Sequence, residues 1–166
     1  MKTFSLIFAI IAALFTIQNA VAQSKIDVPV NSKIEQKPKL VYDADLAKRL
    51  GGDQRGMRKY VLAILKTGPA DITDKEERAR LFKGHFELIN RLAKERKLSV
   101  AGPFTDGGEY RGLYVFNVET IEEAQKLTES DPSIKEGIFR VEFIKWYGSA
   151  ALMEVNNIHN RISKQD

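Results

Sequence analysis

The order of apolar runs and capped segments between Tyr60 and Tyr147 is the feature of this sequence that most constrains its fold. Apolar runs of strand length are bounded by turn-forming residues, whereas two longer segments begin with residues that commonly cap helices. The predicted strands are residues 60–65, 98–101, 112–118 and 138–147, and the predicted helices between them are residues 74–97 and 120–129. The resulting order is strand, helix, strand, strand, helix, strand.

Local capping signals mark where helical segments begin. Asp74 precedes an acidic first turn, and Thr120 with Glu123 has the spacing of a capping box. Asp131 stands before Pro132, an arrangement that is typical of a helix start, and here it opens a short turn.

This order of elements is that of the split βαβ, or ferredoxin-like, arrangement. We therefore predict an α+β fold in which right-handed crossovers place both helices on one face of a four-stranded antiparallel sheet. The strands 60–65 and 112–118 are apolar on both faces, whereas a strand with one wet face would alternate. The face of the sheet away from the two helices must therefore also be buried, and the short helix predicted at 43–50 is too small to bury it alone. We expect two copies of the chain to pair through their sheets as a homodimer.

The first 22 residues have the pattern of a secretory signal peptide. Lys2 is followed by the apolar run 4–17 and then by small residues up to Ala22, after which we predict cleavage. A membrane anchor is the alternative, but the run is shorter than the roughly 20 residues that a transmembrane helix needs. Because the chain has no cysteine, a lipoprotein, a disulfide scaffold and thiol catalysis are excluded. We expect a secreted or periplasmic protein that has no membrane segment after cleavage.

Residues 23–56 are predicted to be a linker with a short helix, and residues 57–153 to be the folded domain. Much of the formal net charge of +4 comes from lysines in this linker, where acidic residues dilute them. No basic face with interleaved aromatic side chains is evident, so we expect no nucleic-acid partner. Residues 154–166 are polar and are predicted to be a frayed tail, which leaves His159 without a role.

His85 is the main candidate for chemistry. A helical wheel places it near the centre of the inward face of segment 74–97, with Gly84 directly before it. One interpretation is a buried histidine that a single hydrogen bond satisfies, and the other is a neutral imidazole poised as a general acid or base. A glycine inside a helix costs about 1 kcal/mol relative to alanine, which indicates either close packing or room for a ligand.

Asp131 is the second candidate, as a helix cap or as the carboxylate that orients the imidazole of His85. The two predicted helices run antiparallel on one face, which brings the end of the second beside the first. Arg111, Tyr114 and Trp146, with Tyr110, are weaker candidates for an anion-binding or aromatic wall, against a role in surface pairing and sheet packing. Nucleophile-elbow, phosphate-loop and zinc-protease motifs are absent, so we expect no metal and no cofactor.

The residues together resemble one family. His85, KLSVAGPF at 97–104, RGLYVFNVETIEEAQKL at 111–127, Asp131-Pro132 and WYGSAALM at 146–153 resemble the YCII-related (YciI-like) domain family over about residues 58–153. The segment YDADLAKRLGG at 42–52 resembles the stretch that precedes the domain in one subgroup.

The resemblance implies a ferredoxin-like fold that dimerises through its sheets into a dimeric α+β barrel, related to muconolactone isomerases. It also implies a site made of a His and an Asp, at the positions of His85 and Asp131, and one branch of the family is associated with dechlorination of an aromatic intermediate. Our leading hypothesis is an enzyme that binds a small organic molecule and performs lyase, isomerase or hydrolytic chemistry. The alternatives are a non-catalytic binding or sensing module and a structural interaction protein.

Overall fold

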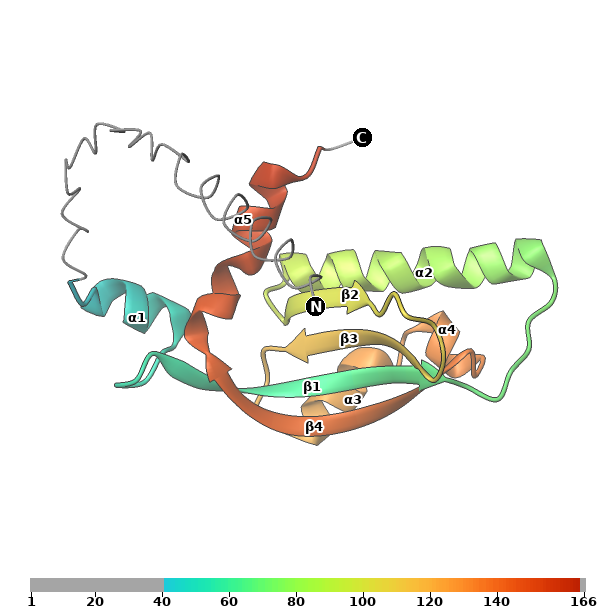
Figure 1. The fold of residues 1–166 in the computed structure, drawn as a ribbon, viewed down its shortest axis with the longest axis horizontal. Coiled ribbons are helices and arrows are strands. Elements are labelled where there is room, and N and C mark those ends of the chain that lie inside the picture. Colours follow the sequence, from blue (N-terminus) through green and yellow to red (C-terminus); the bar gives the residue numbers. More distant parts are fainter. Residues whose placement is uncertain (1–40, 165–166) are drawn as a thin grey trace, which may run out of the picture. The chain divides into compact units, whose positions relative to one another are not determined.

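Residues 41–164 are described by a computed structural model and fold around one four-stranded sheet (Figure 1). The predicted signal peptide and the linker residues 23–40 lie outside the described residues. The elements in chain order are α1 (Ala44–Leu50), β1 (Met57–Thr67), α2 (Lys75–Lys94), β2 (Leu98–Pro103), β3 (Tyr110–Phe116), α3 (Ile121–Thr128), α4 (Pro132–Lys135), β4 (Phe139–Ser149), the 3-10 helix η1 (Ala150–Glu154) and α5 (Val155–Ile162).

The sheet has the strand order β2-β3-β1-β4, and every neighbouring pair is antiparallel. The central strand β1 places Ala63 opposite Tyr114 of β3 and Phe143 of β4. With α2 between β1 and β2, and α3 followed by the short α4 between β3 and β4, this is the ferredoxin-like arrangement, and the predicted α+β fold class is confirmed.

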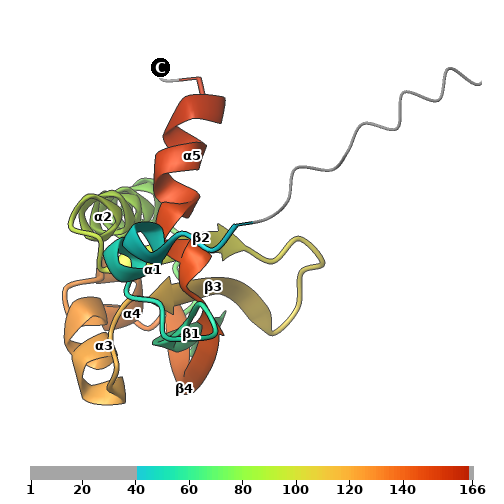
Figure 2. The same cartoon turned by 90° about the vertical axis from the view of Figure 1, so that its left-hand side faces the viewer.

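Helices α2, α3 and α4 lie on the same side of the sheet (Figure 2). Their inward side chains, among them Leu81, Leu88 and Ala124, pack on Val61 and Phe116 of the sheet in the larger apolar cluster. Burying these side chains is the main source of stability for a chain without disulfides.

The predicted caps are confirmed. Asp74 accepts a hydrogen bond from the backbone N–H of Glu77 at 2.8 Å. Thr120 and Glu123 form the reciprocal pair of a capping box at the start of α3. These contacts involve residues three apart in the chain, which is why local sequence was enough to find them.

Gly84 allows α4 to approach α2 closely. A Cβ atom at Gly84 would lie 2.6 Å from Cγ of Pro132, a distance at which one of the two elements must shift. Of the two reasons expected for a glycine inside this helix, close packing is therefore the one that the geometry provides.

Short local segments cover one end of the second face of the sheet. Leu50 of α1 and Ala150 and Met153 of η1 pack with Tyr60 and Val115 in a smaller apolar cluster. On the same face Ile64 is half-buried, and Ile144 and Trp146 of β4 are exposed, although Trp146 pairs with Tyr60 at the margin of this cluster. We call the residues Ile64, Phe104, Tyr110, Ile144 and Trp146 the open sheet patch.

The C-terminal segment differs from the prediction. Residues 155–162 form helix α5, so the expected frayed tail is wrong for this stretch. Asparagine has a modest helix propensity, but Nδ2 of Asn156 donates to the backbone carbonyl of Leu98 at 2.7 Å and attaches α5 to β2. The sequence pattern contains no signal for this tertiary contact.

Element boundaries differ by a few residues. Strand β1 is longer than predicted because its pairing with β4 continues from Met57 to Thr67. Helix α2 ends at Lys94, three residues earlier than predicted, because Arg96 adopts a left-handed backbone conformation with φ of 59°. The backbone N–H of Lys97 then closes the helix end on the carbonyl of Leu92 at 2.9 Å.

Within residues 41–164, none of the helices combines the length and the apolar character that a membrane crossing requires.

Candidate functional site

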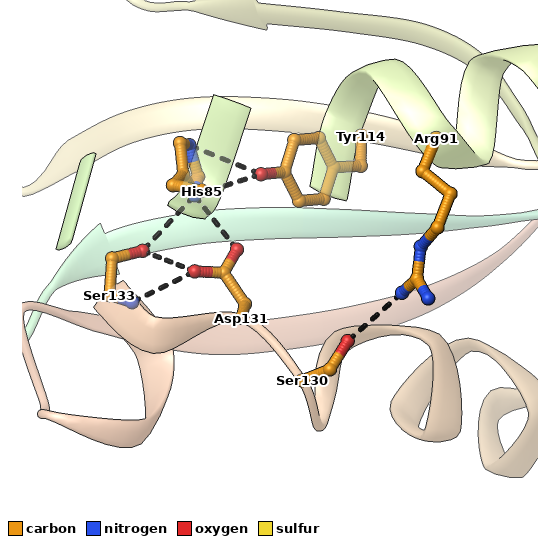
Figure 3. A network of polar contacts seen from close by, with 6 residues as sticks. All are labelled: His85, Arg91, Tyr114, Ser130, Asp131 and Ser133. Carbon is orange, nitrogen blue, oxygen red and sulfur yellow. Dashed lines mark hydrogen bonds and ion pairs between the residues drawn. The ribbon is translucent and has the colours of Figure 1, made fainter. Parts of the chain in front are cut away.

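His85 lies in the middle of α2, with its ring toward the sheet and only 6% of its surface exposed. Its Nδ1 atom is 2.8 Å from Oδ2 of Asp131, which caps the start of α4 (Figure 3). The antiparallel course of the helices predicted this meeting, and the structure brings the two side chains together. The result is a hydrogen-bonded imidazole and carboxylate that are both buried.

The carboxylate of Asp131 serves two elements at once. Its Oδ1 atom accepts hydrogen bonds from the backbone N–H of Ser133 at 2.9 Å and from the Ser133 hydroxyl at 2.6 Å. Its Oδ2 atom accepts from His85. The two interpretations of Asp131, helix cap and orienting carboxylate, therefore apply to different oxygens of one side chain.

Tyr114 of β3 completes the network from the sheet. Its hydroxyl is 3.2 Å from Nε2 and 3.3 Å from Nδ1 of His85. Because Asp131 is an acceptor at Nδ1, the hydrogen-bond network assigns the proton to Nδ1 and leaves the Nε2 lone pair to accept from Tyr114. In the neutral form of the ring, this tautomer has its lone pair on Nε2.

The electrostatic environment keeps Asp131 ionised and Tyr114 protonated. Burial alone would raise the pKa of the Asp131 carboxyl, but hydrogen bonds from His85 and Ser133 outweigh burial and hold this pKa below its ordinary value. Burial, and then the negative charge of Asp131, raises the pKa of Tyr114 far above its ordinary value. Around neutral pH the site therefore holds a carboxylate, an imidazole and a phenol that donates.

Aromatic rings enclose the imidazole. The ring centroids of Phe86 and Phe139 lie 5.5 Å from that of His85, and the centroid of Phe82 lies 6.0 Å away. Phe86 is the outermost of these rings, with 56% of its surface exposed. The enclosure lowers the local dielectric, which strengthens the hydrogen bond between His85 and Asp131.

Ser133 and the three phenylalanines are site residues that were not identified from the sequence. Ser133 lies two residues after the capping Asp131, and the N–H at that position commonly donates to the cap. This spacing is the sequence signal that could have identified Ser133. Phe82 and Phe86 are four residues apart on α2 and thus share a face that His85 adjoins.

Apart from Tyr114, the weaker site candidates lie elsewhere. Trp146 is on the second face of the sheet, with its ring centroid 5.8 Å from that of Tyr60. Arg111 is exposed at the start of β3, and Gly84 packs against Pro132. Of the residues proposed from the sequence, only His85, Asp131 and Tyr114 share one network.

Two surface cavities, of about 510 and 500 Å³, lie away from this network. The first lies beside β2 and α5, the second overlaps the open sheet patch, and neither is lined by His85 or Asp131. Among the described residues, no three His, Asp or Glu side chains are grouped so that they could hold a metal ion.

Comparisons with known proteins give a family and two similar proteins. A sequence model described as the YCII-related domain matches residues 59–147. A stretch of 63 residues is 33% identical to the uncharacterized protein YjpA of Bacillus subtilis (strain 168), and it covers 38% of this chain and 72% of YjpA.

The 5-chloro-2-hydroxyhydroquinone dehydrochlorinase TftG of Burkholderia phenoliruptrix AC1100, solved with 2,5-dihydroxybenzoquinone, matches with a TM-score of 0.40. It is 19% identical, and the match covers 52% of this chain and 92% of the TftG chain.

Asp131→Asn tests the buried pair through its pH dependence. Because the pKa of Asp131 is lower in the folded protein than its ordinary value, the folded state binds fewer protons there than the unfolded state. The charge therefore stabilises the fold above about pH 4, and this contribution is lost as the pH falls through the folded-state pKa. We expect the variant to lower the free energy of unfolding by roughly 1–3 kcal/mol at pH 7, and by less at pH 3, in urea titrations.

The same substitution at Asp43, the exposed cap of α1, controls for the change of a capping side chain. It should alter the free energy of unfolding by no more than about 0.5 kcal/mol, because asparagine caps as well as aspartate. A constant deficit for Asp131→Asn from pH 7 to pH 3 would contradict the assignment.

Proposed function

The chain belongs to the YCII-related domain family, and we propose that it is a small-molecule-binding enzyme with His85 and Asp131 as its acid–base pair. The observation that carries the proposal is the buried contact of 2.8 Å between Nδ1 of His85 and Oδ2 of Asp131. In proton-transfer catalysis, a histidine base is often oriented by a carboxylate that binds the ring nitrogen not involved in the reaction. The reaction class we propose is a lyase, isomerase or hydrolytic reaction on a small organic molecule.

In this proposal Nε2 of His85 is the reacting atom. It takes a proton from the bound substrate in an isomerisation or elimination, or from the attacking water in a hydrolysis, and the ionised Asp131 stabilises the imidazolium that forms. The proton then returns to another atom of the substrate in an isomerisation, or to the leaving group in an elimination or hydrolysis. Asp131 is a positioning residue here, because it acts through His85.

Tyr114 has a place in the same step. Its hydroxyl occupies the position next to Nε2 and would transfer its hydrogen bond to an oxygen of the substrate when the substrate binds. Its raised pKa keeps it a hydrogen-bond donor throughout. We propose that the substrate enters past Phe86, the most exposed ring beside His85.

A non-catalytic small-ligand-binding or sensing module is the second candidate function. The observation that favours it is the enclosure of His85, whose two nitrogens already have partners within the protein. A structural interaction protein would not need a buried imidazole–carboxylate pair.

His85→Gln, with His159→Gln as its matched control, tests catalysis. We first select small organic acids, phenols and ketones that raise the melting temperature of the protein. Each is then incubated with the protein in D2O, and NMR follows the entry of deuterium at carbon atoms of the small molecule. We expect His85→Gln to slow this exchange by about 100-fold or more, since general-base catalysis contributes at least that much. His159 is exposed on α5 and lines the cavity beside β2, away from the network of His85, so its variant should exchange at the wild-type rate.

Equal exchange rates in the wild type and in His85→Gln would exclude His85 as the base. Ligands that bind the wild type without any exchange or turnover would instead favour the binding module.

We also propose that the protein is exported, on the basis of the apolar run 4–17 and the small residues before position 23. When the full-length chain is expressed in a bacterium, we expect it outside the cytoplasm with Gln23 as its N-terminal residue. Intact-mass measurement and N-terminal sequencing check this. A chain that retains residues 1–22 in the membrane fraction would indicate an anchor.

Finally, we propose that two chains pair through the open sheet patch. Its exposed apolar side chains, Ile144 and Trp146 among them, are of the kind that marks protein interfaces. Ile144→Glu should shift the mass measured by light scattering from two chains to one. Ile158→Glu, the same change at an exposed site on α5, should leave the dimer intact. A wild-type protein that is monomeric would overturn the proposal.

A further inference from the structure

A cavity of about 510 Å³ lies between the C-terminal half of α2, the strand β2 and the segment that includes α5. Its volume is within the range of about 300–1,000 Å³ that small-molecule sites occupy. Figure 1 shows α5 standing beside the end of α2 and the start of β2. None of its lining residues belongs to the network of His85 and Asp131, so it is a separate site.

The ionisable side chains around the cavity are all basic. Lys94, Arg96 and His159 line it, and no aspartate or glutamate does. Among residues 41–164, the ion pairs of the protein do not involve Lys94 or Arg96. Two basic side chains that are not neutralised locally favour an anion in the cavity.

The inner wall contains a buried polar group without a strong partner. Ser99 is 2% exposed, and its hydroxyl donates to Sδ of Met153 at 3.2 Å. A thioether is a weak acceptor, and no donor within the described residues reaches the oxygen of Ser99. Buried polar groups are normally satisfied, so this hydroxyl is available to a ligand.

The remaining walls of the cavity consist of asparagine side chains and aliphatic side chains. The side chains of Asn90 and Asn160 line the cavity and offer donors, and Ile89, Val100 and Val155 provide apolar surface. An inorganic anion gains nothing from contact with apolar surface, whereas an organic anion gains free energy by burying its hydrocarbon part against it.

We propose that this cavity binds a small organic carboxylate. Lys94 and Arg96 pair with the carboxylate, Ser99 and the asparagine amides add hydrogen bonds, and the hydrocarbon part of the ligand lies against Ile89, Val100 and Val155. The inference does not depend on the proposed function, because binding here should survive His85→Gln.

Calorimetry on the purified full chain tests the proposal with three probes: octanoate, its uncharged counterpart octanamide, and inorganic phosphate. We expect octanoate to bind with a Kd below about 1 mM, and octanamide and phosphate to bind at least about tenfold more weakly. Amide NMR shifts should locate octanoate at Ser99, Val100 and Asn156.

The variant Lys94→Gln/Arg96→Asn removes both charges, and asparagine tolerates the left-handed conformation of position 96. It should weaken octanoate binding about tenfold or more. Arg91→Gln is the matched control, because Arg91 is on the same helix but contacts Ser130 instead of the cavity. Wild-type NMR spectra in regions away from position 96 verify that each variant folds.

Four results would overturn the proposal. The first is octanoate that does not saturate the protein, and the second is octanamide or phosphate that binds as tightly as octanoate. The third is an Arg91→Gln variant that weakens binding as much as the double variant, which would indicate attraction by net charge alone. Octanoate binding that His85→Gln abolishes would place the ligand at the other site and would also overturn it.

Discussion

The buried carboxylate of Asp131 connects the three parts of the site, and their relative positions depend on it. One oxygen fixes the start of α4 through Ser133, and the other fixes the imidazole that α2 presents. Tyr114 then meets that imidazole from the sheet. A buried charge is costly unless it is fully hydrogen-bonded, so the carboxylate favours the single arrangement in which all of these donors reach it.

Most of the fold and half of the site are predictable from the sequence because they depend on local signals. Asp74, Thr120 and Asp131 cap helices through residues two or three positions away, and the order of elements then determines the topology. The meeting of His85 and Asp131 follows from that topology alone. Ser133, Phe82 and Phe86 have local signals, namely the cap at Asp131 and the helical spacing around His85, that the prediction from the sequence did not use. The contact of Phe139 with His85 depends on how β4 packs under α2, which no periodicity encodes.

The structure places Trp146 and the C-terminal segment differently from the prediction for a related reason. In β4, Phe139 and Phe143 face the helices, so the pleat sends Trp146 to the opposite face of the sheet. Counting residues along the strand would have separated Trp146 from His85. Helix α5, by contrast, depends on a contact between Asn156 and the edge of β2, which is distant in sequence.

Gly84 and Pro132, the two residues that touch where α2 meets α4, are the immediate chain neighbours of His85 and Asp131. The missing side chain at position 84 thus acts as a spacer that sets how closely the imidazole and the carboxylate approach. The distance of 2.8 Å between the imidazole and the carboxylate therefore depends on the steric contact between Gly84 and Pro132. That contact involves neither of the two polar groups. A substitution of this glycine would lengthen the hydrogen bond between His85 and Asp131, although both of these residues would stay unchanged in the sequence.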